Sequence, residues 1–189
     1  MKRLVKTSLF IFMLAGVSAC SAELTELNSA LLKRDPRNQS IEFSFLKDGT
    51  TLTYCVYDLS GEASAADVFR ILLQAADELK AESFETVQLC FRDEARFKLD
   101  GTDFKTIGEE FEIQNPMYTI RTFPEKLKTL TNEQAYMSHQ GGVLYLMRVQ
   151  MADFNDMNGK WFLNDVRAEA EEIKDAQRPT EFASDDEVF

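Results

Sequence analysis

The chain is poor in the side chains that most often act as nucleophiles, bases or metal ligands. It has one histidine, His139, and three cysteines, Cys20, Cys55 and Cys90. A histidine acts as a base or a ligand in concert with partner groups, and no second histidine or spaced thiolate accompanies His139. Its setting in SHQGG is typical of a loop or capping residue. The chemistry to explain is therefore that of the three sulfur atoms.

Other catalytic patterns are absent or poorly placed. No G-x-S-x-G occurs in the chain. Ser44 and Lys47 match S-x-x-K, but that motif acts at the start of a helix, and here the alternating pattern predicts a strand. Acidic residues such as Glu109, Glu110 and Glu112 would suit a carboxylate-dependent hydrolase, although clustered acids are also typical of solvated helix faces. We therefore keep enzyme activity as the alternative hypothesis.

The segment from Asp153 to Asp165 offers many oxygen ligands. A calcium loop requires D-x-[DN]-x-[DN]-G, with Glu at position 12. Counted from Asp153, three key positions hold Met157, Asn158 and Asn164 instead. We expect an interhelical turn, in which Asn158-Gly159 ends a helix and Trp161 packs into the core. The sequence gives no reason to expect a metal or a cofactor.

The N-terminus has the composition of a secretory signal peptide. Lys2, Arg3 and Lys6 precede an uncharged apolar run from Leu9 to Val17, and small residues follow. The run is shorter than the roughly 20 apolar residues that span a bilayer, so the pattern predicts a cleaved signal over residues 1–19.

The end of this segment resembles the lipobox of bacterial lipoproteins. The tetrapeptide is Val17-Ser18-Ala19-Cys20, in which Val17 replaces the commoner Leu. The resemblance implies that Cys20 becomes the lipidated first residue of the mature chain. It also implies outer-membrane sorting in a two-membrane bacterium, because the next residue is Ser21 rather than Asp. The alternative is an ordinary secretory signal with a chance cysteine.

Composition limits the classes of partner. Loss of Lys2, Arg3 and Lys6 would move the formal net charge from −11 to −14. Such an acidic body repels nucleic acid and anionic membrane surfaces, so we expect no nucleic-acid partner. The expected contacts are the membrane, through the lipid on Cys20, and an envelope protein.

Periodicity predicts one α+β domain over residues 40–175, with a mainly antiparallel sheet and helices packed on one face. The expected elements are strands in 41–59 joined at Asp48-Gly49, a helix in 60–83, strands in 85–101 split near Asp93-Glu94, a short helix in 102–113, a possible strand in 117–123, and helices in 141–157 and 161–174. Residues 20–39 read as a lipid-anchored tether with a short amphipathic helix. Residues 176–189 read as a disordered acidic tail.

Cys55 and Cys90 fall on the same face of two predicted strands. The opposite faces are more apolar, and the helix between the strands should cover them. Both cysteines then lie on the uncovered side of the sheet. In the oxidising compartment that a signal peptide implies, such a pair tends to form a disulfide. The alternative is two separate buried thiols, since strand spacing need not suit the bond.

One segment has the composition of a contact surface. Gln114–Leu127 places Tyr118, Arg121 and Phe123 near two prolines, and Tyr and Arg are favoured in interfaces. The alternative is an edge strand ended by Pro124. The sequence thus predicts a membrane-anchored periplasmic lipoprotein that acts as a protein-interaction module: an adaptor, an assembly factor or an inhibitor. A small-ligand binder is the alternative, together with the hydrolase.

Overall fold

The computed structural model describes residues 22–178. Its elements, in chain order, are β1 (Ala22–Glu23), α1 (Thr25–Arg34), the 3-10 turn η1 (Pro36–Ser40), β2 (Ile41–Asp48), β3 (Thr51–Leu59), α2 (Ala65–Glu78), β4 (Thr86–Phe91), β5 (Glu94–Asp100), α3 (Gly101–Glu110), α4 (Pro116–Thr122), the 3-10 turn η2 (Phe123–Lys126), β6 (Leu127–Lys128), α5 (Val143–Asn158), the π-helical turn η3 (Gly159–Leu163) and α6 (Asn164–Ala176). Cys20 and most of the predicted acidic tail lie outside the described residues.

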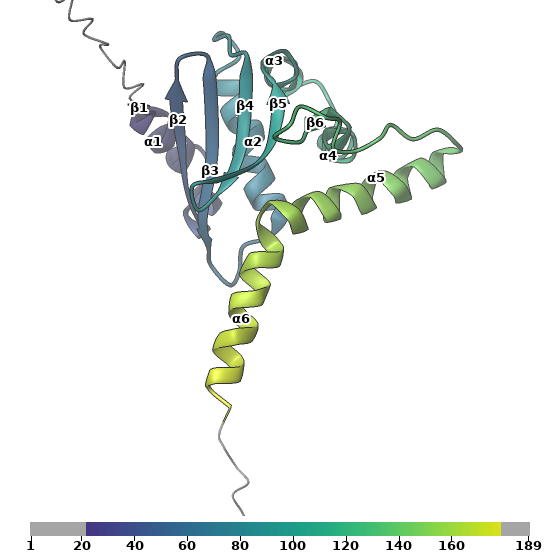
Figure 1. The fold of residues 1–189 in the computed structure, drawn as a ribbon. Coiled ribbons are helices and arrows are strands. Elements are labelled where there is room, and N and C mark those ends of the chain that lie inside the picture. Colours follow the sequence, from purple (N-terminus) through teal and green to yellow (C-terminus); the bar gives the residue numbers. More distant parts are fainter. Residues whose placement is uncertain (1–21, 179–189) are drawn as a thin grey trace, which may run out of the picture.

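The sheet confirms the predicted α+β class. Its six strands lie in chain order, β1 to β6. Neighbouring strands are antiparallel except β3 and β4, which are parallel and joined through α2. Figure 1 shows the sheet in front, with α1 and α2 behind it. The core lies between these two layers.

Both predicted hairpins form where the sequence places them. The β2–β3 turn contains Gly49 at φ +57°. The β4–β5 turn holds Arg92 and Asp93 at φ +49° and +68°. Two positive φ values in succession match the right-handed twist of the flanking strands.

Helix α2 covers the apolar face of the sheet, as predicted. Asp67 Oδ2 accepts hydrogen bonds from the backbone N (2.8 Å) and Oγ (2.6 Å) of Ser64, which fixes the start of the helix. Tyr54 of β3 donates to the carbonyl oxygen of Val68 at 3.0 Å. Helix α3 lies so close to α2 that a Cβ at position 108 would overlap the carbonyl group of Ala76. The glycine at this position therefore permits the close packing.

The N-terminal segment packs on the body instead of standing off as a tether. Leu31 of α1 is fully buried. Arg34 pairs with Asp77 of α2 at 2.6 Å. Asn38 of η1 is buried and donates to Gln74 Oε1 at 2.7 Å. The division expected at residue 39 is therefore not a packing boundary, because these polar groups find partners on α2.

The strand expected over residues 117–123 is wrong. The segment forms α4 and η2, and α4 begins at Pro116. Asn115 Oδ1 accepts from the backbone N of Met117 at 2.9 Å. An Asn cap followed by Pro at the first helical position is a helix-start signal, and it outweighs the β propensity of Tyr118 and Ile120.

Helix α5 ends at Asn158, as expected, but the turn expected to follow at Gly159 is wrong. Gly159 has a helical φ of −55°, and the chain continues through η3 into α6. The extra residue of a π turn redirects a helix, and Figure 1 shows α5 and α6 running in different directions from this corner. Trp161 is fully buried there, as predicted for a core anchor.

Within residues 22–178, no helix has both the length and the apolar character needed to cross a membrane.

Candidate functional site

The predicted disulfide is present. Cys55 and Cys90 occupy paired positions on β3 and β4, with their Cα atoms 4.5 Å apart. Cys55 is fully buried and Cys90 is 3% exposed. Asp93 and Tyr57 lie against this bond: the backbone N of Asp93 is 3.4 Å from Cys55 Sγ, and Tyr57 donates to Asp93 at 3.1 Å. The sulfurs are closed to solvent, so the bond has a structural role.

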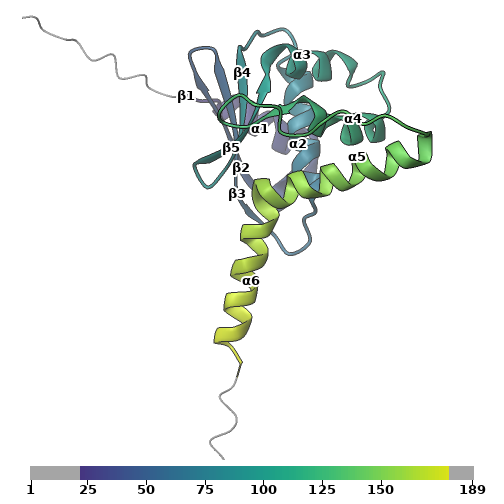
Figure 2. The same cartoon turned by 45° about the vertical axis from the view of Figure 1, so that its right-hand side comes forward.

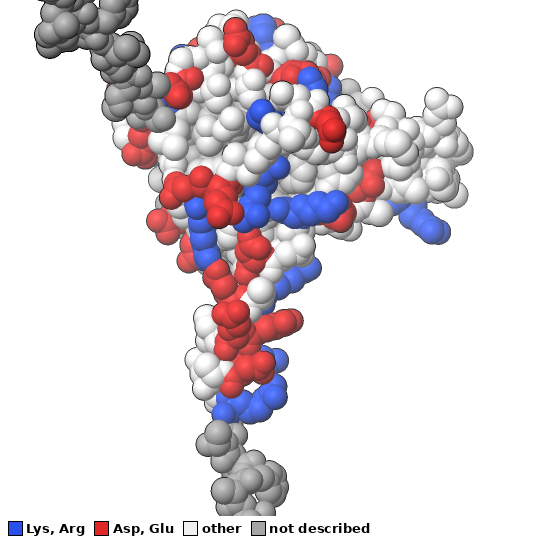
Figure 3. Space-filling view, viewed as in Figure 1, with Lys and Arg blue, Asp and Glu red and all other residues white. Residues whose placement is uncertain are grey.

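The sheet face around the disulfide lies on the side away from α1 and α2 (Figure 1). Figure 3 views this face, whose centre is mostly uncharged. Charges of opposite sign lie together below it. Arg92 pairs with Glu169, and Arg96 pairs with Asp165 at 2.8 Å. These pairs join the β4–β5 turn and strand β5 to α6, and they leave no isolated cationic patch among them.

The three side chains expected on a contact surface within residues 114–127 differ in their exposure. Phe123 is fully buried, with its ring 4.7 Å from that of Phe69. Its assignment to a surface is wrong, because η2 turns the ring into the core. Arg121 is half-buried and donates to the carbonyl oxygen of Met117 at 3.2 Å. Tyr118 is half-exposed.

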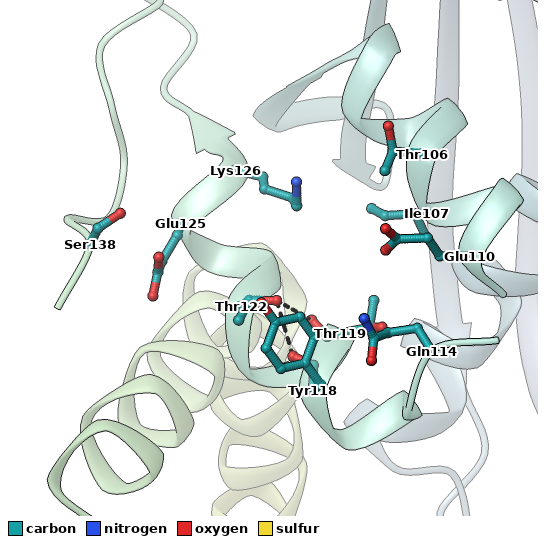
Figure 4. Close-up of a pocket in the computed structure, with 10 residues that line it drawn as sticks. All are labelled: Thr106, Ile107, Glu110, Gln114, Tyr118, Thr119, Thr122, Glu125, Lys126 and Ser138. Atoms are coloured by element: carbon teal, nitrogen blue, oxygen red, sulfur yellow. Dashed lines mark hydrogen bonds between the residues drawn. The ribbon is translucent and has the colours of Figure 1, made fainter. Parts of the chain in front are cut away.

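Tyr118 lines a cavity of about 390 Å³ between α3, α4 and η2. Figure 4 shows Glu110 and Lys126 on either side of this space, with Tyr118 and Gln114 below. The full lining is Thr106, Ile107, Glu110, Gln114, Tyr118, Thr119, Thr122, Glu125, Lys126 and Ser138.

The charged groups of the cavity differ in whether they are already paired. Lys126 Nζ lies 2.6 Å from Asp103. Glu125 accepts from Gln150 at 2.8 Å. Glu110 makes no ion pair or side-chain hydrogen bond with any described residue. Of the acids that the sequence singled out, Glu109 instead pairs with Lys105 at 3.1 Å.

His139 fastens the loop before α5 to that helix. Its Nε2 is 2.6 Å from Asp153 Oδ2. One turn further along, Tyr136 donates to Asp156 at 2.8 Å, and burial together with this carboxylate raises the pKa of Tyr136. A hydrogen bond from Lys160 lowers the pKa of Asp156. Asp153 and Asp156, which belong to the segment that does not match a calcium loop, thus anchor the loop before α5 by hydrogen bonds. Between residues 22 and 178, no cluster of His, Cys, Asp or Glu could hold a metal ion.

The largest feature that the sequence reasoning missed is the far end of α5. Figures 1 and 2 show α5 extending beyond the body. Leu144 is 83% exposed and Val143 is 73% exposed. We call the exposed apolar side chains here the arm tip, which consists of Val143, Leu144, Tyr145 and Met147. In Figure 3 this end of the molecule is nearly free of charged atoms.

The sequence did contain a signal for the arm tip. Residues 143–147 read VLYLM, five apolar residues in succession. A helix turns once in 3.6 residues, so such a run surrounds the helix and cannot pack on one side alone. No Asp or Glu occurs between Glu133 and Asp153, although the chain as a whole is acidic.

Comparisons of the chain with known proteins give no assignment. No protein-family model, no curated protein and no solved structure matches it. No functional residue can therefore be transferred from a relative, and the function must be inferred from the surface itself.

Proposed function

We propose that the chain is a lipid-anchored envelope protein that acts as a protein-interaction module, with the arm tip as its contact surface. The anchor is supported by the signal peptide and by the lipobox resemblance at Cys20. Because β1 begins at Ala22, a lipid on Cys20 would hold the body within about 7 Å of the bilayer. Ser21 favours the periplasmic face of the outer membrane.

The observation that carries the proposal is the exposed arm tip. Large apolar patches on a soluble surface usually mark interaction sites. Leu144 and Val143 are 83% and 73% exposed, so the fold of residues 22–178 leaves them in contact with water. An apolar groove that received this helix end would remove the cost of their hydration.

A protein groove fits the arm tip better than a bilayer does. Helices that lie on membranes carry several Lys or Arg on their polar face, whereas the interval between Glu133 and Asp153 has only Arg148. In both ribbon views, the N-terminal end of the described chain and the arm tip lie on opposite sides of the body. A lipid on Cys20 would thus leave the arm directed away from its own attachment point.

A second copy of the chain is a weaker candidate for the same groove. Two mature copies would each bring a formal charge of −14, and this repulsion disfavours their association. A neutral or basic groove on another envelope protein meets no such penalty.

The alternative is a small-ligand binder or a hydrolase, and the cavity beside α4 supports ligand binding. The hydrolase has less support. Ser138 lines the cavity, but among the described residues the lining holds no hydrogen-bonded pair of a nucleophile and a base, which such catalysis requires.

Photo-crosslinking in cells tests the proposal. A p-benzoylphenylalanine residue would replace Leu144 at the arm tip, and Ile173 on α6, 58% exposed, gives the matched control position. We expect the probe at 144 to capture one envelope protein that the probe at 173 does not. Leu144→Asp should abolish this complex, whereas Ile173→Asp should not. Capture of lipid or of a second copy, or no specific adduct, would overturn the proposal.

A further inference from the structure

The charged side chains that line the cavity beside α4 favour a positively charged ligand. Lys126 is already paired with Asp103 at 2.6 Å. Glu110 and Glu125 are the remaining charged groups of the lining, and among the described residues the side chain of Glu125 has a neutral amide, that of Gln150, as its hydrogen-bond partner. The cavity therefore carries an excess of negative charge and attracts a cation.

The reverse reading, an anion held by Lys126, conflicts with the same contacts. An anion would have to displace Asp103 from Lys126. It would then lie beside Glu110, which faces Lys126 across the cavity in Figure 4. Two carboxylates within one small cavity disfavour a third negative group.

The uncharged lining suits a cation carried on an organic side chain. Tyr118 is 49% exposed, so its ring can receive a guanidinium or ammonium group by a cation–π contact. Thr119 and Ser138 add hydroxyl oxygens that accept hydrogen bonds. The volume of about 390 Å³ lies at the small end of the range for ligand pockets, roughly 300–1,000 Å³, which is room for one long side chain.

The cavity lies beside the helix that carries the arm tip. Glu125 of its lining accepts a hydrogen bond from Gln150 at 2.8 Å, and Gln150 lies less than one helical turn beyond Met147 of the arm tip. Helix α4, which carries Tyr118, packs against α5. A partner that covers the arm tip and the next turn of α5 therefore reaches the cavity as well. Buried contacts of Tyr with Arg are frequent centres of binding energy in interfaces.

We infer that the cavity receives one Arg or Lys side chain of the protein that binds the arm tip. The contact with Glu110 supplies the charge pairing, and the ring of Tyr118 supplies the flat face. The inference that this side chain belongs to a partner protein rests on the proposed function. The preference of the cavity for a cation can be measured without any partner.

The first test uses the mature protein, labelled with ¹⁵N, and Nα-acetyl-arginine amide as the probe. Nα-acetyl-citrulline amide, which has nearly the same shape without the charge, is the control ligand. We expect saturable shifts of the amides of Glu110, Tyr118 and Thr119 with arginine only. Glu110→Gln should weaken the binding about three- to tenfold, as for one partly exposed charged contact. Glu109→Gln, which removes a charge outside the lining, should leave it unchanged.

Equal shifts with citrulline, no localised shifts, or equal effects of Glu110→Gln and Glu109→Gln would overturn the cation site. The second test uses the partner captured at position 144. Glu110→Gln should reduce its affinity, and a probe at position 118 should crosslink next to a partner Arg or Lys. A captured partner that is indifferent to Glu110→Gln would refute the role of the cavity but leave the arm tip in place. If the arm tip captures nothing, the proposed function fails, and the arginine titration still decides whether the cavity binds a cation.

Discussion

The indole Nε1 of Trp161 donates a hydrogen bond to the carbonyl oxygen of Cys90 across 3.0 Å. This bond joins the corner between α5 and α6 to the strand that carries the disulfide. The Trp161 ring also meets the ring of Tyr54 edge-on at 5.5 Å. The C-terminal end of α5 is therefore anchored in the core, whereas the arm tip at its other end is exposed to solvent.

Trp161→Phe should destabilise the protein by about 2–4 kcal/mol. The change leaves the carbonyl of Cys90 without its donor, which costs about 1–3 kcal/mol, and it removes buried volume. Urea unfolding followed by circular dichroism measures the loss. Ile173→Ala on the exposed side of α6 is the control and should stay within about 0.5 kcal/mol of the parent. If Trp161→Phe and the parent unfold at the same urea concentration, the hydrogen bond from Trp161 does not stabilise the corner between α5 and α6.

Replacement of both Cys55 and Cys90 by Ala should lower the free energy of unfolding by about 2–4 kcal/mol. The bond closes a loop with a sequence separation of 35, so its loss frees the unfolded chain. The measurement is the urea midpoint of the parent and the double variant.

A thiol titration of the denatured, unreduced mature protein gives an independent check on the disulfide. With Cys20 modified, it should find no reactive thiol. Two reactive thiols, or an unchanged midpoint in the double variant, would contradict a stabilising bond.

The elements that the sequence predicts correctly are those that local pattern decides. Alternation on both sides of Asp48-Gly49 and helical spacing after Ser64 depend on neighbours in the chain. That Cys55 and Cys90 share one side of the sheet also followed, because α2 had to cover the apolar faces of both strands, whereas their pairing depends on β3 and β4 being neighbours, which the sequence left open. For these inferences it is enough to know which face of each strand is buried.

The features that the sequence left open depend on contacts between distant residues. The docking of α1 rests on Asn38 meeting Gln74 and Arg34 meeting Asp77. The cavity combines Glu110 with Tyr118 and Ser138, which come from three separate segments. The burial of Phe123 followed from the unrecognised cap at Asn115. Two features did have a local signal: the helix start at Asn115-Pro116, and the run VLYLM of the arm tip.

Arg34→Met should destabilise the protein at pH 7 by about 1 kcal/mol, and this effect should vanish in acid. Burial alone raises the pKa of Asp77, but hydrogen bonds from Lys80 and Arg34 outweigh it and hold the pKa below the ordinary value of 3.8. A carboxyl with a lowered pKa contributes stability above its unfolded value, and this is lost as the pH falls through its folded value. The difference between parent and variant should therefore shrink below about pH 4.

Urea unfolding of parent and variant at pH 7 and at about pH 2.5 measures the change in that difference. Lys33→Met alters an exposed residue on the same helix and should show a small effect at either pH. A difference for Arg34→Met that is the same at both pH values would show that Arg34 acts through packing rather than through Asp77.

Cys20→Ala should abolish the incorporation of radiolabelled palmitate and shift the protein from the membrane fraction to the soluble fraction. Three acyl chains would give nearly permanent attachment, since each buried CH₂ contributes about 0.8 kcal/mol and a single chain binds only marginally. The double Cys55→Ala, Cys90→Ala variant is the control, and it should keep its label because those sulfurs are joined in the fold. Label retained in Cys20→Ala would refute Cys20 as the lipidated residue, and a parent protein that takes up no label would remove the anchor from the proposed function. The arm tip, whose exposure does not depend on a lipid, would then act on a partner from a freely diffusing protein.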